Sequence, residues 1–205
     1  MKKILLAFLL LIIVNCKAQT PIISLSTTDY VNIPQNAYIK DVEGILNPFV
    51  GTWKWTDTST NSEFTVVFVK IEENNFSGIN PYFKDEIFGG YKYVLNGVLI
   101  AEKLIFTTEF VPTDISTFSA FAPISSNIHS PFDNLSLFIS DIVKNKLCFG
   151  SFKFINPDTG PNGQWLPTEA RWKMWNRETW IINNDSPQPQ IGFSIPTDIV
   201  LTKFN

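Results

Sequence analysis

The chain has 205 residues, with 16 basic and 19 acidic side chains and a formal net charge of −3 at neutral pH. No stripe of basic residues occurs, which argues against a nucleic-acid-binding protein. The 18 Phe and 6 Trp stand out, because so many large rings either fill a core or line a cavity. With only Cys16 and Cys148 present, a disulfide framework is excluded.

Residues 1–18 are predicted to form an export signal. Met1, Lys2 and Lys3 precede an unbroken apolar run over residues 4–14. A basic start, about 7–15 apolar residues and a small-residue exit are typical of a secretory signal peptide. The run is too short to cross a bilayer as a helix, which takes roughly 17–25 residues.

Two cleavage sites predict different kinds of anchoring. Residues 13–16 resemble a bacterial lipobox, in which Cys16 becomes a diacylglyceryl-modified N-terminus, although Asn15 replaces the usual Gly, Ala or Ser. The alternative cut follows Ala18 and leaves Gln19 first. We favour lipidation at Cys16, which predicts stable anchoring because several acyl chains hold far better than one.

The mature chain divides into a short leader and one domain. Residues 19–44 are polar and interrupted by Pro21 and Pro34, which predicts a tether with one or two edge segments. The domain follows over residues 45–205. Strand signals repeat through it from about residue 51, and residues 64–71 are apolar on both faces, as in a strand deep within a barrel.

The clearest local signal is a hairpin. Residues 87–95 alternate between two faces, end at Asn96-Gly97 and resume in the apolar run 98–100. Asn-Gly between two such runs predicts a type I′ turn, whose central residues need positive φ. The pair Gly89-Gly90 inside the strand predicts a bulge or a sharp bend.

Further strand signals complete an all-β pattern. Lys144-Asn145 predicts a tight turn between two of the runs, and about 8–10 short strands of this kind are typical of an antiparallel sandwich or barrel. The remaining long segments are either functional loops or surface decoration. The strand runs are 135–143, 146–155, 170–175 and 199–204, and the long segments are 111–132, 156–167 and 183–196.

Residues 46–53, Leu-Asn-Pro-Phe-Val-Gly-Thr-Trp, resemble the entry motif of lipocalins. Three pieces together are similar to a family of uncharacterised lipocalin-like (calycin-type) secreted lipoproteins of Gram-negative bacteria: 37–55, 87–97 and 196–203. The resemblance implies an antiparallel lipocalin-like meander barrel of about 8–10 strands. It also implies a structural plug at the barrel base, made by Phe49, Gly51 and Trp53, and a late Arg, either Arg171 or Arg177, packed across Trp53.

Five side chains are candidates for the lining of a cavity, with plain core or surface packing as the alternative for each. Trp55 lies two residues beyond Trp53 on the same strand face. If the strand faces that carry them point inward, the phenols would supply polar groups inside an apolar site, as ligand cavities require. The candidates are Trp55, Tyr91, Tyr93, Trp172 and Met174.

No catalytic or metal-binding motif is evident. Asp85-Glu86 and Glu72-Glu73 are adjacent carboxylates, and adjacent strand residues point to opposite faces, which prevents joint acid–base catalysis. His129 lies alone in a Ser-rich loop, and Cys148 is expected to be a buried strand residue. We therefore expect neither a cofactor nor a metal.

The leading hypothesis is a non-catalytic, lipid-anchored barrel that binds a small apolar ligand or lipid. The alternative is a barrel filled by its own aromatic side chains, which would serve as an interaction module of the cell envelope. The expected location is the periplasm-facing side or the outer membrane of a Gram-negative bacterium, or the soluble periplasmic or secreted fraction if cleavage follows Ala18.

Overall fold

A computed structural model describes residues 20–104, 124–128, 130–161, 163–181 and 191–204, with side chains of the strand that ends at residue 181 described as far as residue 175. The fold is all-β, with a closed antiparallel eight-stranded barrel, which confirms the predicted fold class. The predicted signal peptide and Cys16 lie outside the described residues. Among the residues described, no helix combines the length and apolar character needed to cross a bilayer.

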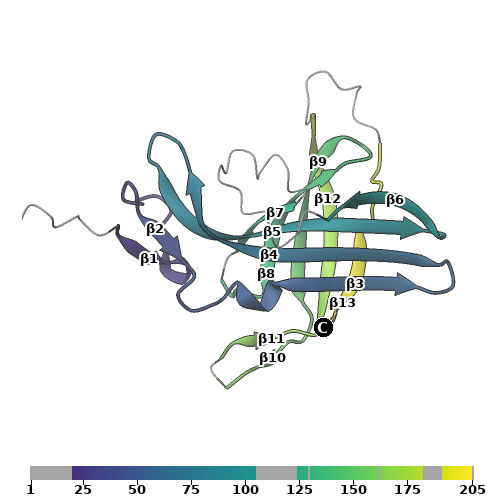
Figure 1. Cartoon of the computed structure of the whole chain (residues 1–205), viewed down its shortest axis with the longest axis horizontal. Helices are drawn as coiled ribbons and strands as arrows, with labels where there is room; N and C mark the ends of the chain where they lie inside the picture. Colours follow the sequence, from purple (N-terminus) through teal and green to yellow (C-terminus); the bar gives the residue numbers. More distant parts are fainter. Residues whose placement is uncertain (1–19, 105–123, 129, 162, 182–190, 205) are drawn as a thin grey trace, which may run out of the picture.

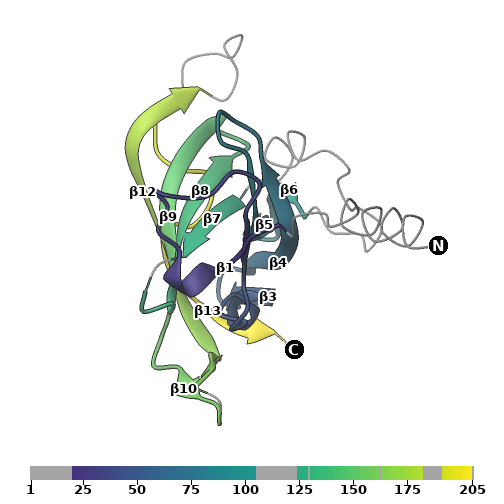
Figure 2. The ribbon, with the colours of Figure 1, turned by 90° about the vertical axis from the view of Figure 1, so that its left-hand side faces the viewer.

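The barrel is a meander in which consecutive strands pair, and its last strand pairs with its first (Figures 1 and 2). A short seam of two residue pairs, between Phe88–Gly89 and Ile124–Ser125, closes the wall. The eight strands are β3 (Gly51–Asp57), β4 (Ser62–Phe76), β5 (Tyr82–Leu95), β7 (Ile124–Ile128), β8 (Asn134–Asp141), β9 (Lys146–Phe154), β12 (Glu169–Ile181) and β13 (Asp198–Phe204).

Strand β6 (Val98–Lys103) forms the predicted hairpin with β5. Asn96 and Gly97 have φ angles of 52° and 76°, as a type I′ turn requires. The predicted bulge at Gly89-Gly90 is wrong, because both glycines pair in register with β4. A Cβ on Gly89 would lie 2.8 Å from the Phe68 ring, so this glycine makes room for that side chain instead.

Smaller elements cover the base of the barrel, the end at which β3 begins. Strands β1 (Ile22–Ser24) and β2 (Tyr38–Lys40) extend the sheet in parallel from β5, and the helix η1 (Leu25–Thr27) lies between them. The helix η2 (Asn47–Phe49) leads into β3. Within residues 20–44, Leu25 and Ile39 are buried, so this segment is packed onto the domain.

Two of the predicted long segments contain strands. Residues 156–167 hold β10 (Asp158–Thr159) and β11 (Trp165–Leu166), which form a separate two-stranded sheet below the barrel in Figure 1. Segment 111–132 contains β7, whose residues alternate between buried and half-buried. Residues 105–123 and 129 lie outside the described part of the chain.

The core is a cluster of aromatic rings inside the barrel. Phe152 has ring-centroid distances of 4.9 Å to Trp53, 5.0 Å to Phe68 and 6.4 Å to Phe49. Edge-to-face contacts of this kind add about 0.5–1.5 kcal/mol each beyond the apolar area they bury. The buried core cluster therefore uses Phe49, Phe64, Phe68, Phe152 and Phe154 together with Trp53 and Trp172.

Candidate functional site

The five candidate lining residues all pack in or against the barrel core. Tyr91 and Trp172 are fully buried, and Met174 and Tyr93 are 5% and 9% exposed. Trp55 is half-buried and packs against the same cluster. Phe64 contacts three aromatic members of the set, with ring centroids 5.2–6.0 Å apart. The strand alternation that places them together was visible in the sequence, whereas the direction of each face was not.

The polar atoms of Tyr91 and Trp172 are used inside the protein. The Tyr91 hydroxyl donates to Ser140 O at 2.7 Å and accepts from the Ile142 amide at 3.1 Å. Burial raises the pKa of Tyr91 well above its usual range, so the phenol stays protonated. The Trp172 indole donates to Pro196 O at 2.8 Å. The Tyr91 hydroxyl thus joins β5 to residues 140–142, and the Trp172 indole joins β12 to Pro196.

Phe49 and Trp53 meet at the barrel base. The Trp53 indole donates to Phe49 O at 2.9 Å, and the Phe49 ring stacks on Phe154 with centroids 4.2 Å apart. Gly51 lies between them with a φ of 121°, which is strained for residues with a side chain. This glycine turns the chain from η2 into β3 and brings the indole back over η2.

The residue packed across Trp53 is a lysine. Lys203 pairs with Trp53 in the β3–β13 register, places its ammonium 5.2 Å from the indole ring and donates to Pro48 O at 2.8 Å. The expectation of an arginine is wrong for Arg171, which faces outward in an exposed ion pair with Asp198. The side chain of Arg177 lies outside the described part. Lys203 is the last residue of the segment 196–203, on which the resemblance partly rests. Nothing in the sequence indicated that a lysine there would pack across Trp53.

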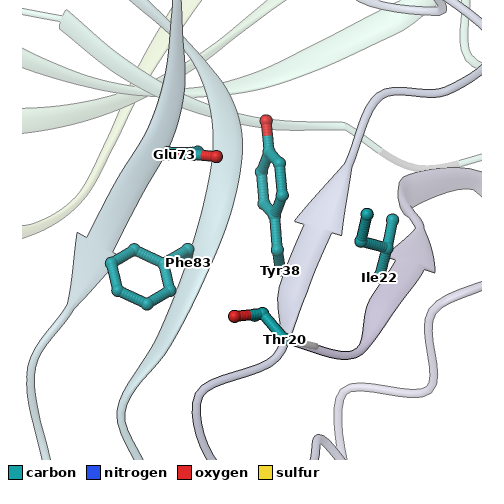
Figure 3. Close-up of a pocket in the computed structure, with 5 residues that line it drawn as sticks. All are labelled: Thr20, Ile22, Tyr38, Glu73 and Phe83. Atoms are coloured by element: carbon teal, nitrogen blue, oxygen red, sulfur yellow. The ribbon is translucent and has the colours of Figure 1, made fainter. Parts of the chain in front are cut away.

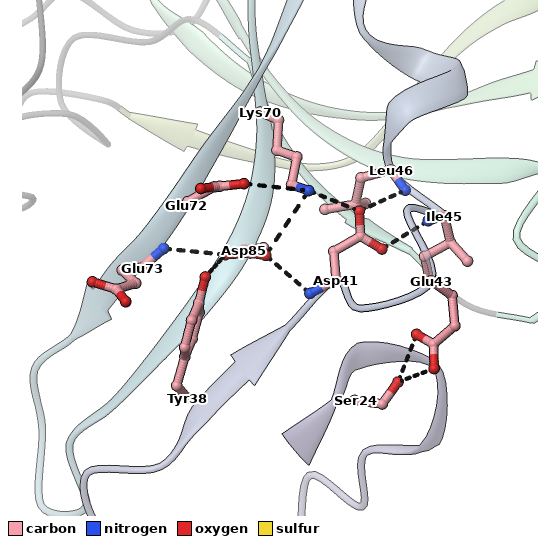
Figure 4. A network of polar contacts seen from close by, with 10 residues as sticks. All are labelled: Ser24, Tyr38, Asp41, Glu43, Ile45, Leu46, Lys70, Glu72, Glu73 and Asp85. Carbon is pink, nitrogen blue, oxygen red and sulfur yellow. Dashed lines mark hydrogen bonds and ion pairs between the residues drawn. The ribbon is translucent and has the colours of Figure 1, made fainter. Parts of the chain in front are cut away.

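A buried ionic network holds the base together (Figure 4). Asp41 and Asp85 are 5% and 1% exposed, and the Lys70 ammonium lies between them, 3.0 Å from Asp41 and 4.0 Å from Asp85. Asp85 also accepts hydrogen bonds from the Tyr38 hydroxyl at 2.6 Å, the Asp41 amide at 2.9 Å and the Glu73 amide at 3.1 Å. Both oxygens of Asp85 are thus occupied.

Asp41 continues the network toward the barrel entry. Its carboxylate accepts from the amides of Ile45 at 2.7 Å and Leu46 at 3.2 Å, and so holds the turn before η2. Burial and the neighbouring Asp85 raise the pKa of Tyr38, which keeps its phenol a donor. The network joins β2, β4 and β5, and the carboxylates of its two buried acids, Asp41 and Asp85, both accept hydrogen bonds and lie beside the Lys70 ammonium. Sequence reasoning missed it, because its members come from separate segments.

An open pocket of about 480 Å³ adjoins this network (Figure 3). Thr20 and Ile22 line one side, Phe83 and Glu73 the other, and the Tyr38 ring lies between them. The Tyr38 hydroxyl is already bound to Asp85. The lining therefore offers mainly apolar surface with one exposed carboxylate, a composition without a catalytic pair.

Residues 191–197 are tied to the far end of the barrel, opposite the base. Asp141 accepts from the Ser194 amide at 2.7 Å, from the Ser194 hydroxyl and from the Lys144 amide at 3.0 Å. The Lys146 ammonium donates to Gly192 O, and Ile195 inserts into the core with 3% exposure. This segment belongs to the predicted long segment 183–196, of which residues 182–190 lie outside the described part.

The described residues contain no constellation suited to catalysis or metal binding. Asp85 and Glu86 face opposite sides of β5, as predicted: Asp85 lies in the base network and Glu86 pairs with Lys84. Cys148 is buried, and burial raises the pKa of its thiol to about 11. No group of three or more potential metal-ligating side chains occurs among the residues described. His129 lies outside them.

Residues 1–204 match a family described as a family of unknown function, DUF6705. The chain belongs to this family. No curated protein and no solved structure matches it. For this member of DUF6705 the architecture is a closed antiparallel eight-stranded barrel, and its relationship to lipocalins stays a prediction.

Proposed function

We propose that the chain is an exported, lipid-anchored, non-catalytic module of the Gram-negative cell envelope, which binds its partner through its outer surface. The observation that carries this proposal is the self-filled interior. Small barrels are commonly packed solid, and a solid barrel leaves recognition to its surface. The export and lipid anchor rest on the sequence of residues 1–18.

The packing of the interior supports the proposal. The large side chains that are fully or almost fully buried come from both halves of the chain, and their rings contact one another. Such a cluster gains both apolar burial and ring contacts, and a ligand that displaced these rings would have to replace both. The largest of these aromatic side chains are Trp53, Trp172, Tyr91, Phe49, Phe64, Phe68 and Phe152.

Polar contacts at both ends of the barrel also oppose entry of a ligand. At the base, the Asp41–Lys70–Asp85 network fastens residues 38–46 across the opening. At the far end, Asp141 and Lys146 hold residues 191–197. Opening either end would leave buried charged groups without partners, at about 1–3 kcal/mol or more for each such group.

The proposal is tested by native mass spectrometry of the mature protein, purified both directly and after solvent extraction. We expect the same mass from both preparations and no saturable binding of palmitate or 1-anilinonaphthalene-8-sulfonate. An acylated Cys16 adds a fixed covalent mass, which denaturing mass spectrometry separates from bound lipid. A non-covalent lipid at one per chain would overturn the self-filled barrel.

A second candidate function is the carriage of a small apolar ligand in the barrel. The observation that favours it is the position of Trp55, which is half-buried, and of Tyr93, the most exposed of the buried lining candidates. Both lie toward the far end, where an apolar molecule would meet a ring and a phenol. Under this alternative, lipid co-purifies with the protein, and Trp55→Ala together with Tyr93→Ala lowers its occupancy.

The lipid anchor has its own test. Replacing Cys16 with Ser should release the protein from membranes and abolish incorporation of labelled palmitate, whereas Cys148→Ser, at the buried thiol, should leave both unchanged. A wild-type protein that is already soluble and begins at Gln19 would establish the cut after Ala18 and remove the anchor from the proposal.

A further inference from the structure

A polar and aromatic groove of about 510 Å³ lies on the outside of the barrel wall. It runs along the outward face of the β4–β5 hairpin and reaches β7 and β8. Its volume is within the range of roughly 300–1,000 Å³ typical of small-molecule sites. The side chains that matter for its chemistry are Asn74, Phe76, Tyr82, Lys84, Glu86 and Asn127.

The charges in the groove compensate one another. Lys84 and Glu86 are 5% and 9% exposed and form an ion pair at 3.1 Å. The Lys84 ammonium also donates to Asn127 Oδ1 at 3.1 Å and lies 5.3 Å from the Tyr30 ring and 5.9 Å from the Phe76 ring. The groove therefore presents no unmatched charge to a cation or an anion, which favours a neutral ligand.

One buried polar atom in the groove lacks a partner. Asn74 is 4% exposed, and its amide nitrogen donates to Glu86 Oε2 at 2.9 Å. Its Oδ1 accepts no hydrogen bond from the described part of the chain. A buried acceptor left in this state costs about 1–3 kcal/mol. The oxygen itself is closed off from solvent, so a hydroxyl donor in the groove can relieve this cost only if the Asn74 side chain turns toward it.

Flat apolar surface adjoins this acceptor. The rings of Phe76 and Tyr82 stack with centroids 4.9 Å apart and planes 4° from parallel, and both side chains are half-buried. A ligand that fits must therefore combine an apolar C–H face with hydroxyl donors and carry no net charge. A sugar ring has these three properties.

We propose that this groove binds a neutral saccharide, with one ring face on the Phe76–Tyr82 pair, and that the Asn74 side chain turns so that its buried Oδ1 accepts a sugar hydroxyl. The proposal rests on the proposed function, in which the outer surface carries recognition. It names the ligand class of that surface, a short neutral glycan. Lys84 and Glu86 hold the groove in shape and add polar contacts at its floor.

The test is isothermal titration of the full mature chain with a panel of neutral trisaccharides: maltotriose, cellotriose, laminaritriose, xylotriose, mannotriose and N,N′,N″-triacetylchitotriose. We expect at least one of them to bind, with an affinity unchanged between low and high salt because no net charge is involved. Asn74→Leu and Phe76→Ala should each weaken binding about tenfold. Phe204→Ala, at an exposed ring over which Lys54 lies on the other side of the barrel, is the matched control and should bind normally.

The outcomes separate this inference from the proposed function. If none of the six sugars binds at about 10 mM, or if Phe76→Ala binds with unchanged affinity, the saccharide site is overturned. The self-filled barrel stands or falls on lipid co-purification, which does not involve the groove. Circular dichroism of Phe76→Ala, at a half-buried surface position, verifies that a loss of binding does not reflect unfolding.

Discussion

The two ends of the barrel are held by different chemistry. At the base, two carboxylates, Asp41 and Asp85, share one ammonium from Lys70. At the far end, Asp141 is saturated by neutral donors and Lys146 binds a carbonyl oxygen. Among the contacts described, the base combines charge pairing with hydrogen bonds, whereas Asp141 at the far end accepts from amides and a hydroxyl and Lys146 donates to a carbonyl oxygen.

The two ends also differ in the chain segment that each of them fixes to the barrel. The base network ties residues 38–46 to two long strands, so its loss affects the docking of an entire N-terminal segment. The far-end contacts hold only residues 191–197, a segment that reaches the core mainly through Ile195. We expect the base to contribute more to global stability and the far end to open locally.

The largest effect is expected for Asp85→Ala. The substitution leaves the Tyr38 hydroxyl and the amides of Asp41 and Glu73 without an acceptor. It also removes one of the two carboxylates beside the Lys70 ammonium, and together these losses should cost about 3–5 kcal/mol in the free energy of unfolding. Urea denaturation measures it. Asp198→Ala breaks only an exposed ion pair and should leave the midpoint almost unchanged. Equal losses in the two variants would contradict a special role of the base.

Asp141→Ala should have a smaller global effect, about 2–3 kcal/mol, because the contacts that it loses, with two amides and one hydroxyl, are only part-buried and include no ion pair with another described residue. Hydrogen exchange measured by mass spectrometry should show faster exchange in residues 191–197 than in residues 38–46. Uniform acceleration across both segments would mean that the far end is not an independent unit.

At the plug, Lys203→Met should cost about 1 kcal/mol, because it removes the contact with the Trp53 ring and the hydrogen bond to Pro48 O while keeping the alkyl stem. Lys203→Arg restores a cation and should recover most of the loss. Thermal unfolding of the pair measures the difference. A stable Lys203→Met variant would show that the cation does not support the plug.

The smallest effect concerns Cys148, whose thiol has a pKa raised from 9.0 to about 11 in the fold. The unfolded chain releases this proton near pH 9, whereas the folded chain keeps it until about pH 11. The folded state thus binds more protons between these values, and the thiol contributes a loss of stability as pH rises through that window. Cys148→Ala should flatten this part of the stability curve relative to wild type.

The reactivity of the Cys148 thiol can also report local opening of the far end. Asp141 and Lys146 both influence the pKa of Cys148, which places it near the far end. Labelling with a thiol reagent at pH 8 should therefore accelerate more in Asp141→Ala than in Asp85→Ala after correction for global stability. The reverse order would reject local opening of the far end.

Much of the wall was predictable from the sequence because it depends on short-range rules. Alternation placed Tyr91 and Trp172 on one face of their strands, and the Asn96-Gly97 turn followed from its need for positive φ. The contact between Phe49 and Trp53 at the barrel base was predicted from the resemblance to the lipocalin entry motif. The bulge expected at Gly89-Gly90 was wrong, since Gly89 makes room for the neighbouring Phe68 ring, a contact that no local rule reveals.

The polar clusters were not predictable, because each joins segments far apart in the chain. Asp41, Lys70 and Asp85 carry no spacing that distinguishes them from solvated strand residues. The groove could not be predicted either. The pairing of β4 with β5 shifts by one residue between Ile71 and Asn74, and this shift reverses the sheet face on which Asn74 and the residues after it are expected to lie. Single-sequence alternation has no means of locating such a shift.

The pairing of β13 with β3 has a consequence for how the chain reaches its native state. Thr202 pairs with Lys54, although the two residues lie near opposite ends of the domain's sequence. The pairing of β13 with β3 therefore forms only after a costly loop closure. Until then β3 presents unpaired backbone groups, a template for association between folding intermediates. A synthetic peptide that copies residues 198–204 should compete for that edge during refolding and leave the completed barrel untouched.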